Sequence, residues 1–207
     1  MTLIDDLNWR YATKKFDPAK KLTSDELDFL KEAIRLTATS YGLQPFKVII
    51  VEDDSLKAKL KPSSYGQNQI TDASHLFVFC NLTKINTDLI DYYVKLSAET
   101  RNLDVESLSG YGNFMKSTIG ELKPEALSNW TAKQAYIAMS NLLTACAELR
   151  IDSCPIEGFL KDEYNAILEL NELGLEAAVA VSVGYRAEDD KAQFATKVRL
   201  SQTDLFI

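Results

Sequence analysis

Histidine and cysteine are scarce in this sequence. Its 207 residues include one histidine, His75, and three cysteines, Cys80, Cys146 and Cys154. One histidine cannot build a multi-histidine metal site, and three cysteines without C-x-x-C spacing support neither a zinc site nor a disulfide framework. We therefore expect no bound metal, a structural role for His75, and a reducing, cytoplasmic location.

Long apolar runs and an excess of positive charge are also missing. The longest apolar stretches, Leu76–Cys80 and Leu175–Tyr185, are too short to span a bilayer, and the start does not read as a signal peptide. The formal net charge of −7 argues against general binding to nucleic acid or to an anionic membrane. Neither a G-x-S-x-G elbow nor a P-loop is present, which weakens hydrolase and nucleotide-triphosphate functions.

What is present is a regular alternation of helical and strand patterns, which indicates one α/β domain over residues 1–207, with more helix than strand. The clearest helix start is Thr23 with Glu26 three residues later, a capping-box pattern. We expect helices over 22–36, 55–61, 88–99, 129–150 and 161–170, strands over 46–51, 75–82 and 177–185, and an extended tail over 186–207. The apolar helix over 129–150 should be buried on most sides.

Positive charges gather near both ends of this acidic chain. Arg10 and Lys14 are four residues apart and would share one side of a helical turn. Lys197 and Arg199 are two apart and would share one side of an extended segment. If the two pairs converge, they form a small phosphate site, because guanidinium and ammonium groups match phosphate oxygens. Taken pair by pair, they are equally compatible with solvated surface charge.

Six short motifs occur in order along the chain. They are "RYATKKFDP", "TATSYGLQPFKVIIV", "DASHLFVFC", "AKQAYIAMSN", "PIEGF" and the late "KVR". In order and spacing the chain resembles the FMN-dependent nitroreductases, closest to the oxygen-insensitive nitroreductase and NAD(P)H-flavin reductase branch. The resemblance implies an α+β, three-layer fold with a central mixed, mainly antiparallel sheet flanked by helices. It also implies an intertwined homodimer that binds FMN at the subunit interface.

The resemblance accounts for the clustered cations. It assigns Arg10, Lys197 and Arg199 to the FMN phosphate, and the neighbouring Tyr11 and Ala12 to backbone contacts. Lys14 matches a lysine near the N1–O2 edge of the flavin, where a cation favours the anionic reduced form.

The loop "TATSYGLQP" matches a Pro-Ser-Ser-x-Asn-x-Gln-Pro loop that reaches the flavin of the other subunit. Ala38, Thr39 and Ser40 stand at its first positions. Gly42 replaces its asparagine, which removes that side-chain contact. Gln134 matches a position near this loop. The resemblance places two aromatic residues, Tyr41 and Phe114, in the substrate pocket.

The resemblance also places the "PIEGF" turn against the flavin ring, with a backbone N–H from the Glu-Gly pair directed at N5. The matching residues are Pro155, Ile156, Glu157 and Gly158. Where relatives carry an asparagine and a lysine near the pyrimidine edge, this chain offers the uncharged Gln67 and Gln69.

The implied activity is ping-pong hydride transfer from NADH or NADPH, through FMN, to a small acceptor such as a nitroaromatic, a quinone or free flavin. No protein acid or base is essential, because the cofactor carries the chemistry. Two alternatives stay open. One is a specialised reductase of the same fold, such as a dihydropteridine reductase, and the other is a non-enzymatic FMN-binding protein.

Overall fold

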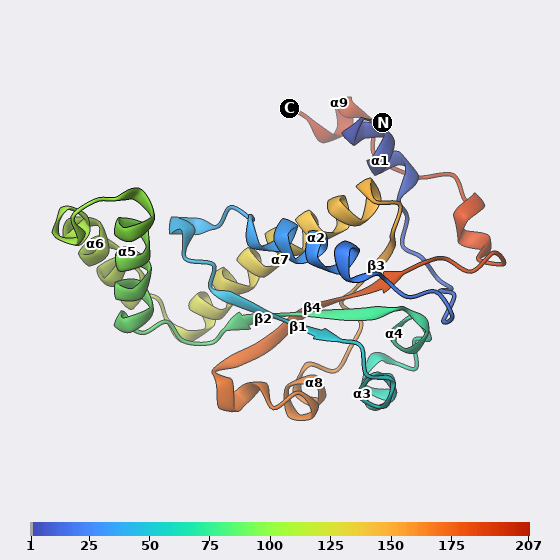
Figure 1. The fold of residues 1–207 in the computed structure, drawn as a ribbon, viewed down its shortest axis with the longest axis horizontal. Helices are drawn as coiled ribbons and strands as arrows, with labels where there is room; N and C mark the ends of the chain where they lie inside the picture. The colour runs from blue at the N-terminus through green and yellow to red at the C-terminus, as the bar shows by residue number, and fades with distance from the viewer. Residues whose placement is uncertain (1) are drawn as a thin grey trace.

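The centre of the molecule is a four-stranded sheet, and the computed structural model describes residues 2–207 around it (Figure 1). The strand order is β1-β2-β4-β3, and every neighbouring pair is antiparallel. The strands are β1 (Phe46–Val51), β2 (His75–Leu82), β3 (Asp152–Ile156) and β4 (Leu175–Gly184). The helices are α1 (Leu3–Trp9), α2 (Ser24–Arg35), α3 (Asp54–Leu60), α4 (Gln69–Asp72), α5 (Thr87–Arg101), α6 (Ser109–Gly120), α7 (Pro124–Glu148), α8 (Lys161–Ile167) and α9 (Gln202–Leu205). The predicted α+β fold class is confirmed.

Helices cover both faces of this sheet. Side chains along β2 point alternately to its two sides, and those on both sides are apolar, so each face needs a covering layer. Leu76 and Val78 enter the core beneath α3, α4 and α8, whereas Phe77 and Phe79 enter the core beneath α2 and α7. All four side chains are fully buried. A central strand covered on both faces therefore appears in the sequence as a continuous apolar run. Helices α5 and α6 extend from one end of these layers (Figure 1).

The capping-box prediction is confirmed at the start of α2. The Glu26 N–H donates to Thr23 Oγ1 at 3.2 Å, and the Thr23 N–H donates to Glu26 Oε2 at 2.7 Å. Helix α7 begins earlier than predicted, with Pro124 in its first turn, where proline loses no helical hydrogen bond. Its face toward the sheet is buried, but Ile137 on the opposite side is 45% exposed in the single chain.

Two expectations about local structure were wrong, and a third holds in part. Residues 152–156 form the strand β3 in addition to the three strands expected, and Pro155 fits there because β3 is an edge strand. Arg10 ends α1, and the chain then runs extended, with Ala12 bridging in parallel to Ser153. Arg10 and Lys14 therefore do not share a helical turn. The tail after β4 is mainly extended but contains the 3₁₀ helix η5 (Lys191–Phe194) and α9.

The scarce residues occupy structural positions. His75 is 3% exposed, its Nδ1 lies 2.9 Å from Ser74 Oγ, and burial lowers its pKa. Cys80, Cys146 and Cys154 are buried free thiols. Among residues 2–207, no helix combines the length and apolar character that crossing a membrane requires.

Truncation of Leu142 should measure how much the α7–sheet core stabilises the fold. Leu142 is fully buried in that core. Leu142→Ala should lower the free energy of unfolding by about 2–5 kcal/mol, because it removes apolar contacts and leaves a cavity. The exposed Lys133 on the same helix provides the matched control, and Lys133→Ala should change stability by less than about 0.5 kcal/mol. Urea unfolding at fixed protein concentration measures both, and equal effects would contradict this account of the core.

Candidate functional site

One carboxylate ties the two ends of the chain together. Asp190 is 2% exposed and accepts hydrogen bonds from the Tyr11 hydroxyl and the Lys14 N–H, both at 2.9 Å. It also accepts from the Ala192 N–H at 3.1 Å, at the start of η5. Burial acts to raise the pKa of Asp190, but these hydrogen bonds outweigh it and lower the pKa. The charged carboxylate therefore fixes the tail against the segment that follows α1.

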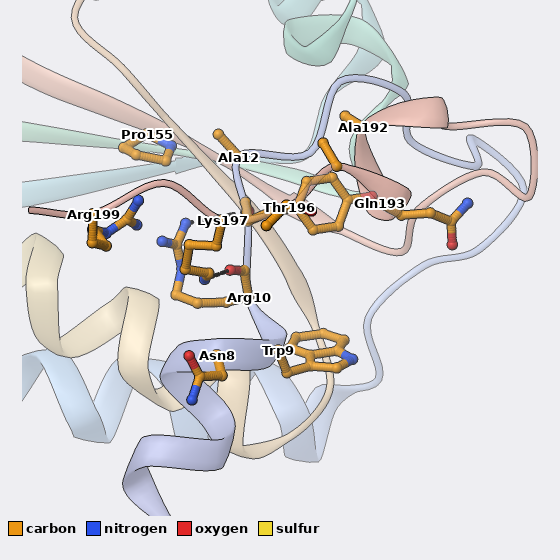
Figure 2. Close-up of a pocket in the computed structure, with 12 residues that line it drawn as sticks. Asn8, Trp9, Arg10, Ala12, Pro155, Ala192, Gln193, Thr196, Lys197 and Arg199 are labelled. Atoms are coloured by element: carbon orange, nitrogen blue, oxygen red, sulfur yellow. Dashed lines mark hydrogen bonds between the residues drawn. The ribbon is translucent and has the colours of Figure 1, made fainter.

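A cavity of about 420 Å³ lies between these two segments (Figure 2). Arg10 comes from the end of α1, while Lys197 and Arg199 come from the tail. The structure thus brings together most of the residues predicted for the phosphate site. The lining residues are Asn8, Trp9, Arg10, Tyr11, Ala12, Pro155, Ala192, Gln193, Ala195, Thr196, Lys197 and Arg199.

The three cations in this cavity are held by backbone groups. Lys197 Nζ donates to the Leu7 carbonyl at 2.7 Å and also to the Arg10 carbonyl. Arg10 donates to the Tyr11 carbonyl at 3.2 Å. Within residues 2–207, none of the three cations forms an ion pair with a carboxylate. Positive charge is therefore concentrated here without a counter-ion from the described chain.

The electrostatics show that this arrangement is costly. Burial, followed by the charge of Arg199, lowers the pKa of Arg10. Burial and the charges of Arg10 and Arg199 lower the pKa of Lys197. Arg10 Nε is a buried donor with no acceptor. Because buried donors are normally paired, this orphaned N–H and its repelling neighbours fit a bound anion such as a phosphate.

Two other arginines nearby differ, because both have carboxylate partners. Arg186 pairs with Asp152 at 2.6 Å and lies 4.5 Å from the ring centre of Trp9. Arg150 pairs with Asp6 at 2.7 Å. These pairs brace the end of α1 against β3 and α7. Arg150 and Arg186 thus stabilise the fold through ion pairs, whereas the three cations of the cavity do not.

Lys14 borders a neighbouring hollow rather than the Arg10 cavity. This hollow is also lined by Lys15, Asp190, Lys191 and Ala192, and Ala192 belongs to both spaces. Lys14 lies two residues after Ala12, which bridges in parallel to Ser153 of β3.

The turn after β3 continues away from the cation cavity. Pro155 lines the cavity, whereas the Ile156 side chain is 3% exposed and packs in the core. Glu157 Oε1 accepts from the Tyr136 hydroxyl at 2.6 Å. Gln67 Nε2 donates to the Gly158 carbonyl at 2.9 Å and to the Ser64 carbonyl at 3.0 Å. Both N–H groups of Gln67 are thus used within the chain, which leaves its oxygen as the group free to meet a ligand.

The loop of residues 37–45 lies elsewhere, toward the other end of the long axis of the molecule (Figure 1). The Ser40 N–H donates to Gln134 Oε1 at 2.8 Å, and the Gln44 N–H donates to Thr39 Oγ1 at 3.0 Å. Ala38, at the start of this loop, is exposed. Thr39, Tyr41 and Gly42 line a second cavity of about 420 Å³. In one chain, the predicted site residues therefore form two separate groups.

The predicted substrate-pocket aromatics do lie together. The ring centres of Tyr41 and Phe114 are 6.3 Å apart, and those of Tyr41 and Trp130 are 6.1 Å apart. Tyr41 holds a left-handed backbone with φ of 58°. At the next position, Gly42 has φ of +76°, and the Tyr93 side chain fills the space that a Cβ would need. A side chain at position 42, such as the expected asparagine, would displace Tyr93.

Comparison with known proteins identifies the family. The family model described as "Nitroreductase family" matches residues 7–185. This chain belongs to the nitroreductase family. The protein named "Putative NAD(P)H nitroreductase YfkO" from Bacillus subtilis (strain 168) is 34% identical over 210 residues, covering 95% of this chain and 94% of that relative. "Putative NAD(P)H nitroreductase SERP2086" from Staphylococcus epidermidis is 35% identical over 215 residues, covering 99% and 95%.

A solved structure confirms the nitroreductase fold. It is described as "a putative nitroreductase in complex with FMN from Exiguobacterium sibiricum 255-15", and it matches with a TM-score of 0.87. The match covers 99% of this chain and 96% of that one at 17% identity. At that identity the likeness concerns the fold alone.

Several residues of the candidate site carried no signal in the sequence. Asp190 lies in the acidic run "EDD", which looks like solvated surface. Trp9, Gln193 and Thr196 line the cation cavity, but no motif marks them. Their roles depend on the meeting of two chain ends that are nearly 190 residues apart, as in the Lys197–Leu7 contact.

Substitution at Gly42 should test how tightly the loop and α5 fit. Gly42→Ala should cost about 1–3 kcal/mol of stability, because alanine is strained at positive φ and its Cβ meets Tyr93. When Tyr93 is also replaced by alanine, the loss of stability caused by Gly42→Ala should fall to about 1 kcal/mol, because only the backbone strain at positive φ remains. Thermal or urea unfolding measures these changes.

Gly110 provides the matched control. It lies in α6, and a Cβ built there meets no atom within 4 Å. Gly110→Ala should be neutral or stabilising, because alanine favours helix. An equal loss of stability for Gly42→Ala and Gly110→Ala would contradict the close packing of Gly42 against Tyr93.

Proposed function

We propose that this protein is an FMN-dependent NAD(P)H oxidoreductase that works as a homodimer. The observation that carries the proposal is the cavity in which Arg10, Lys197 and Arg199 meet without a carboxylate, with Arg10 Nε buried and unpaired. These groups fit a phosphate monoester. The names of the relatives, which include NAD(P)H nitroreductase, and the FMN complex of the Exiguobacterium sibiricum protein support the same conclusion.

The residues present would hold FMN in distinct ways. Arg10, Lys197 and Arg199 would bind its phosphate. Lys14, on the segment beside β3, would place a positive charge near the ring system. When bound, FMN would supply the hydride chemistry that no side chain here provides.

The turn after β3 would form one wall of the ring site. Tyr136 holds the Glu157 side chain, and Gln67 holds the Gly158 carbonyl, so the backbone between them is oriented before a ligand arrives. The remaining Gln67 oxygen would accept a hydrogen bond from a ring N–H. Gln69, at the start of α4, would lie along the same edge.

A second copy of the chain would complete the site. The loop of residues 37–45, with Gln134 behind it, lies far from the cation cavity of its own chain (Figure 1). A homodimer would bring this loop to the FMN of the partner. Exposed apolar side chains on α1, α7 and the tail support such an interface. They include Leu3, Ile4, Ile137, Val198, Leu200 and Phe206.

The overall reaction would be ping-pong. NAD(P)H would leave as NAD(P)⁺ before the acceptor enters the same pocket. With a quinone, the balance is NAD(P)H + H⁺ + quinone → NAD(P)⁺ + hydroquinone, so two electrons and two protons reach the acceptor. The protein would bind, orient and exclude water, and Tyr41 and Phe114 would border the entering acceptor.

An absorption spectrum followed by anaerobic addition of NADH, and then NADPH, tests this proposal. We expect a bound-flavin spectrum that bleaches with at least one donor and returns when a quinone is added. A flavin that neither donor bleaches would instead indicate a binding protein. Absence of flavin after incubation with FMN would overturn the proposal.

Loss of a cavity cation should weaken FMN binding. Arg10→Gln and Lys197→Gln should each raise the dissociation constant about tenfold to a hundredfold, because a charged hydrogen bond contributes about 1.5–3 kcal/mol. The exposed Arg35, which pairs with Glu32 on α2, is the control, and Arg35→Gln should leave FMN affinity unchanged. Fluorescence titration of flavin-free protein measures each constant.

The same titration should depend on pH. The pKa of Lys197 is lowered in the free protein, so the lysine loses its proton at a lower pH than an ordinary lysine. The dissociation constant of FMN should therefore rise as pH increases through that lowered pKa. Lys197→Gln should abolish this rise. A rise that persists in the variant would assign the titration to another group.

A further inference from the structure

The second cavity has a composition suited to a particular class of acceptor. Three tyrosines line it: Tyr41 from the loop, Tyr93 from α5 and Tyr111 from α6. Ser97 and Arg101, also on α5, complete its polar side. A volume of about 420 Å³ is within the range of small-ligand pockets. Aromatic walls with one cation are suited to a planar, negatively charged molecule.

Arg101 is the cation that gives this cavity its charge. Within residues 2–207 its guanidinium forms no ion pair with a carboxylate and no side-chain hydrogen bond. Lys95, on the same helix, differs because it lies 3.8 Å from Glu99. Arg101 and Tyr111 line the same cavity; burial raises the pKa of Tyr111, and the charge of Arg101 acts in the opposite direction. Its guanidinium is thus available to a carboxylate.

The loop that closes the cavity is held in a strained, fitted form. Tyr41 and Gln44 both have positive φ, at 58° and 46°, although neither is glycine. Tyr93 occupies the space beside Gly42, so the loop and α5 interlock. Backbone strain of this kind persists where the surroundings hold it, and it is frequent in ligand sites. The cavity is therefore a built feature rather than an accidental gap between surface side chains.

We propose that this cavity selects nitroaromatic or quinone acceptors that carry a carboxylate on the ring, with Arg101 binding the unreacted carboxylate and the tyrosines contacting the ring. This inference rests on the proposed function, which brings the loop of residues 37–45 to the FMN of the partner. For a nitroaromatic acid the balance is 4-nitrobenzoate + 2 NAD(P)H + 2 H⁺ → 4-hydroxylaminobenzoate + 2 NAD(P)⁺ + H₂O. The nitro nitrogen gains four electrons, and one of its oxygens leaves as water.

The test compares two acceptors that differ in charge but not in ring size. 4-Nitrobenzoate and 4-nitrobenzamide are each reduced at saturating donor by wild type, Arg101→Gln and Arg101→Lys. We expect Arg101→Gln to lower kcat/KM for 4-nitrobenzoate at least about fivefold, the loss of one exposed charge-assisted hydrogen bond, and to change 4-nitrobenzamide less than about twofold. Arg101→Lys should retain part of the preference for 4-nitrobenzoate over 4-nitrobenzamide, because lysine keeps the positive charge. Lys95→Gln removes a charge from the same helix and should leave the preference intact.

A binding measurement separates this inference from the proposed function. Calorimetry with benzoate and benzamide should show that wild type prefers benzoate and that Arg101→Gln loses the preference. Equal losses for charged and uncharged acceptors, or benzoate binding that does not depend on Arg101, would overturn this inference alone. A protein that binds no FMN but still binds benzoate through Arg101 would overturn the proposed function and keep this cavity as a carboxylate site.

Discussion

The site depends on a buried carboxylate, Asp190, that joins the two ends of the chain. It accepts hydrogen bonds from the Tyr11 hydroxyl and the Lys14 N–H on one side and from the Ala192 N–H on the other. The Ala187 N–H, which donates to the Lys15 carbonyl at 3.0 Å, and the exposed Lys15–Asp189 ion pair join the same two segments, but Asp190 is the buried charge between them. Because its pKa is lowered, Asp190 remains charged at neutral pH and the contact persists. A residue that contacts none of the three cavity cations thus helps to position them.

The cations themselves are held at an energetic cost that a ligand would recover. Arg10 and Lys197 lose solvation and repel each other, and Arg10 Nε has no acceptor. A bound anion would reduce the repulsion between the two cations and would accept a hydrogen bond from Arg10 Nε. Its affinity would therefore come from removing these two costs as well as from new hydrogen bonds. The formal net charge of −7 gives no general attraction for anions. Selectivity for a phosphate, which the proposed function requires, would therefore come from the Arg10 cavity alone.

The second cavity shows how one small residue changes a neighbouring structure. Gly42 removes a side chain from the loop, and the Tyr93 side chain takes the vacated space. The aromatic lining that Tyr93 shares with Tyr41 and Tyr111 is therefore a property of the loop and α5 together. Arg101 then supplies the charge. In a family whose chemistry resides on a shared cofactor, such differences in the pocket are where acceptor preference can arise.

Much of this could be predicted from the sequence alone. Local patterns were sufficient for β1, β2, the capping box of α2 and the long helix α7, because hydrophobic period and capping residues act over a few positions. The resemblance located the cation cluster, the loop and the turn after β3. The short strand β3 was missed, since a five-residue edge strand with a proline has little local signal. Gln67 was expected near the pyrimidine edge of the flavin, but the sequence could not show that its N–H groups bond within the chain.

Only the tertiary structure decided which charges are paired and which are free. Arg150 and Arg186 have carboxylate partners, whereas Arg10 and Arg101 have none among residues 2–207, and nothing in the residues next to them distinguishes the two kinds. The roles of Asp190 and Tyr93 also depend on tertiary contacts, with Tyr11 and Ala192 for Asp190 and with Gly42 for Tyr93. The sequence determined which side chains exist and which short segments are helix or strand. Their burial and their partners depend on contacts between distant parts of the chain, and these exist only after folding.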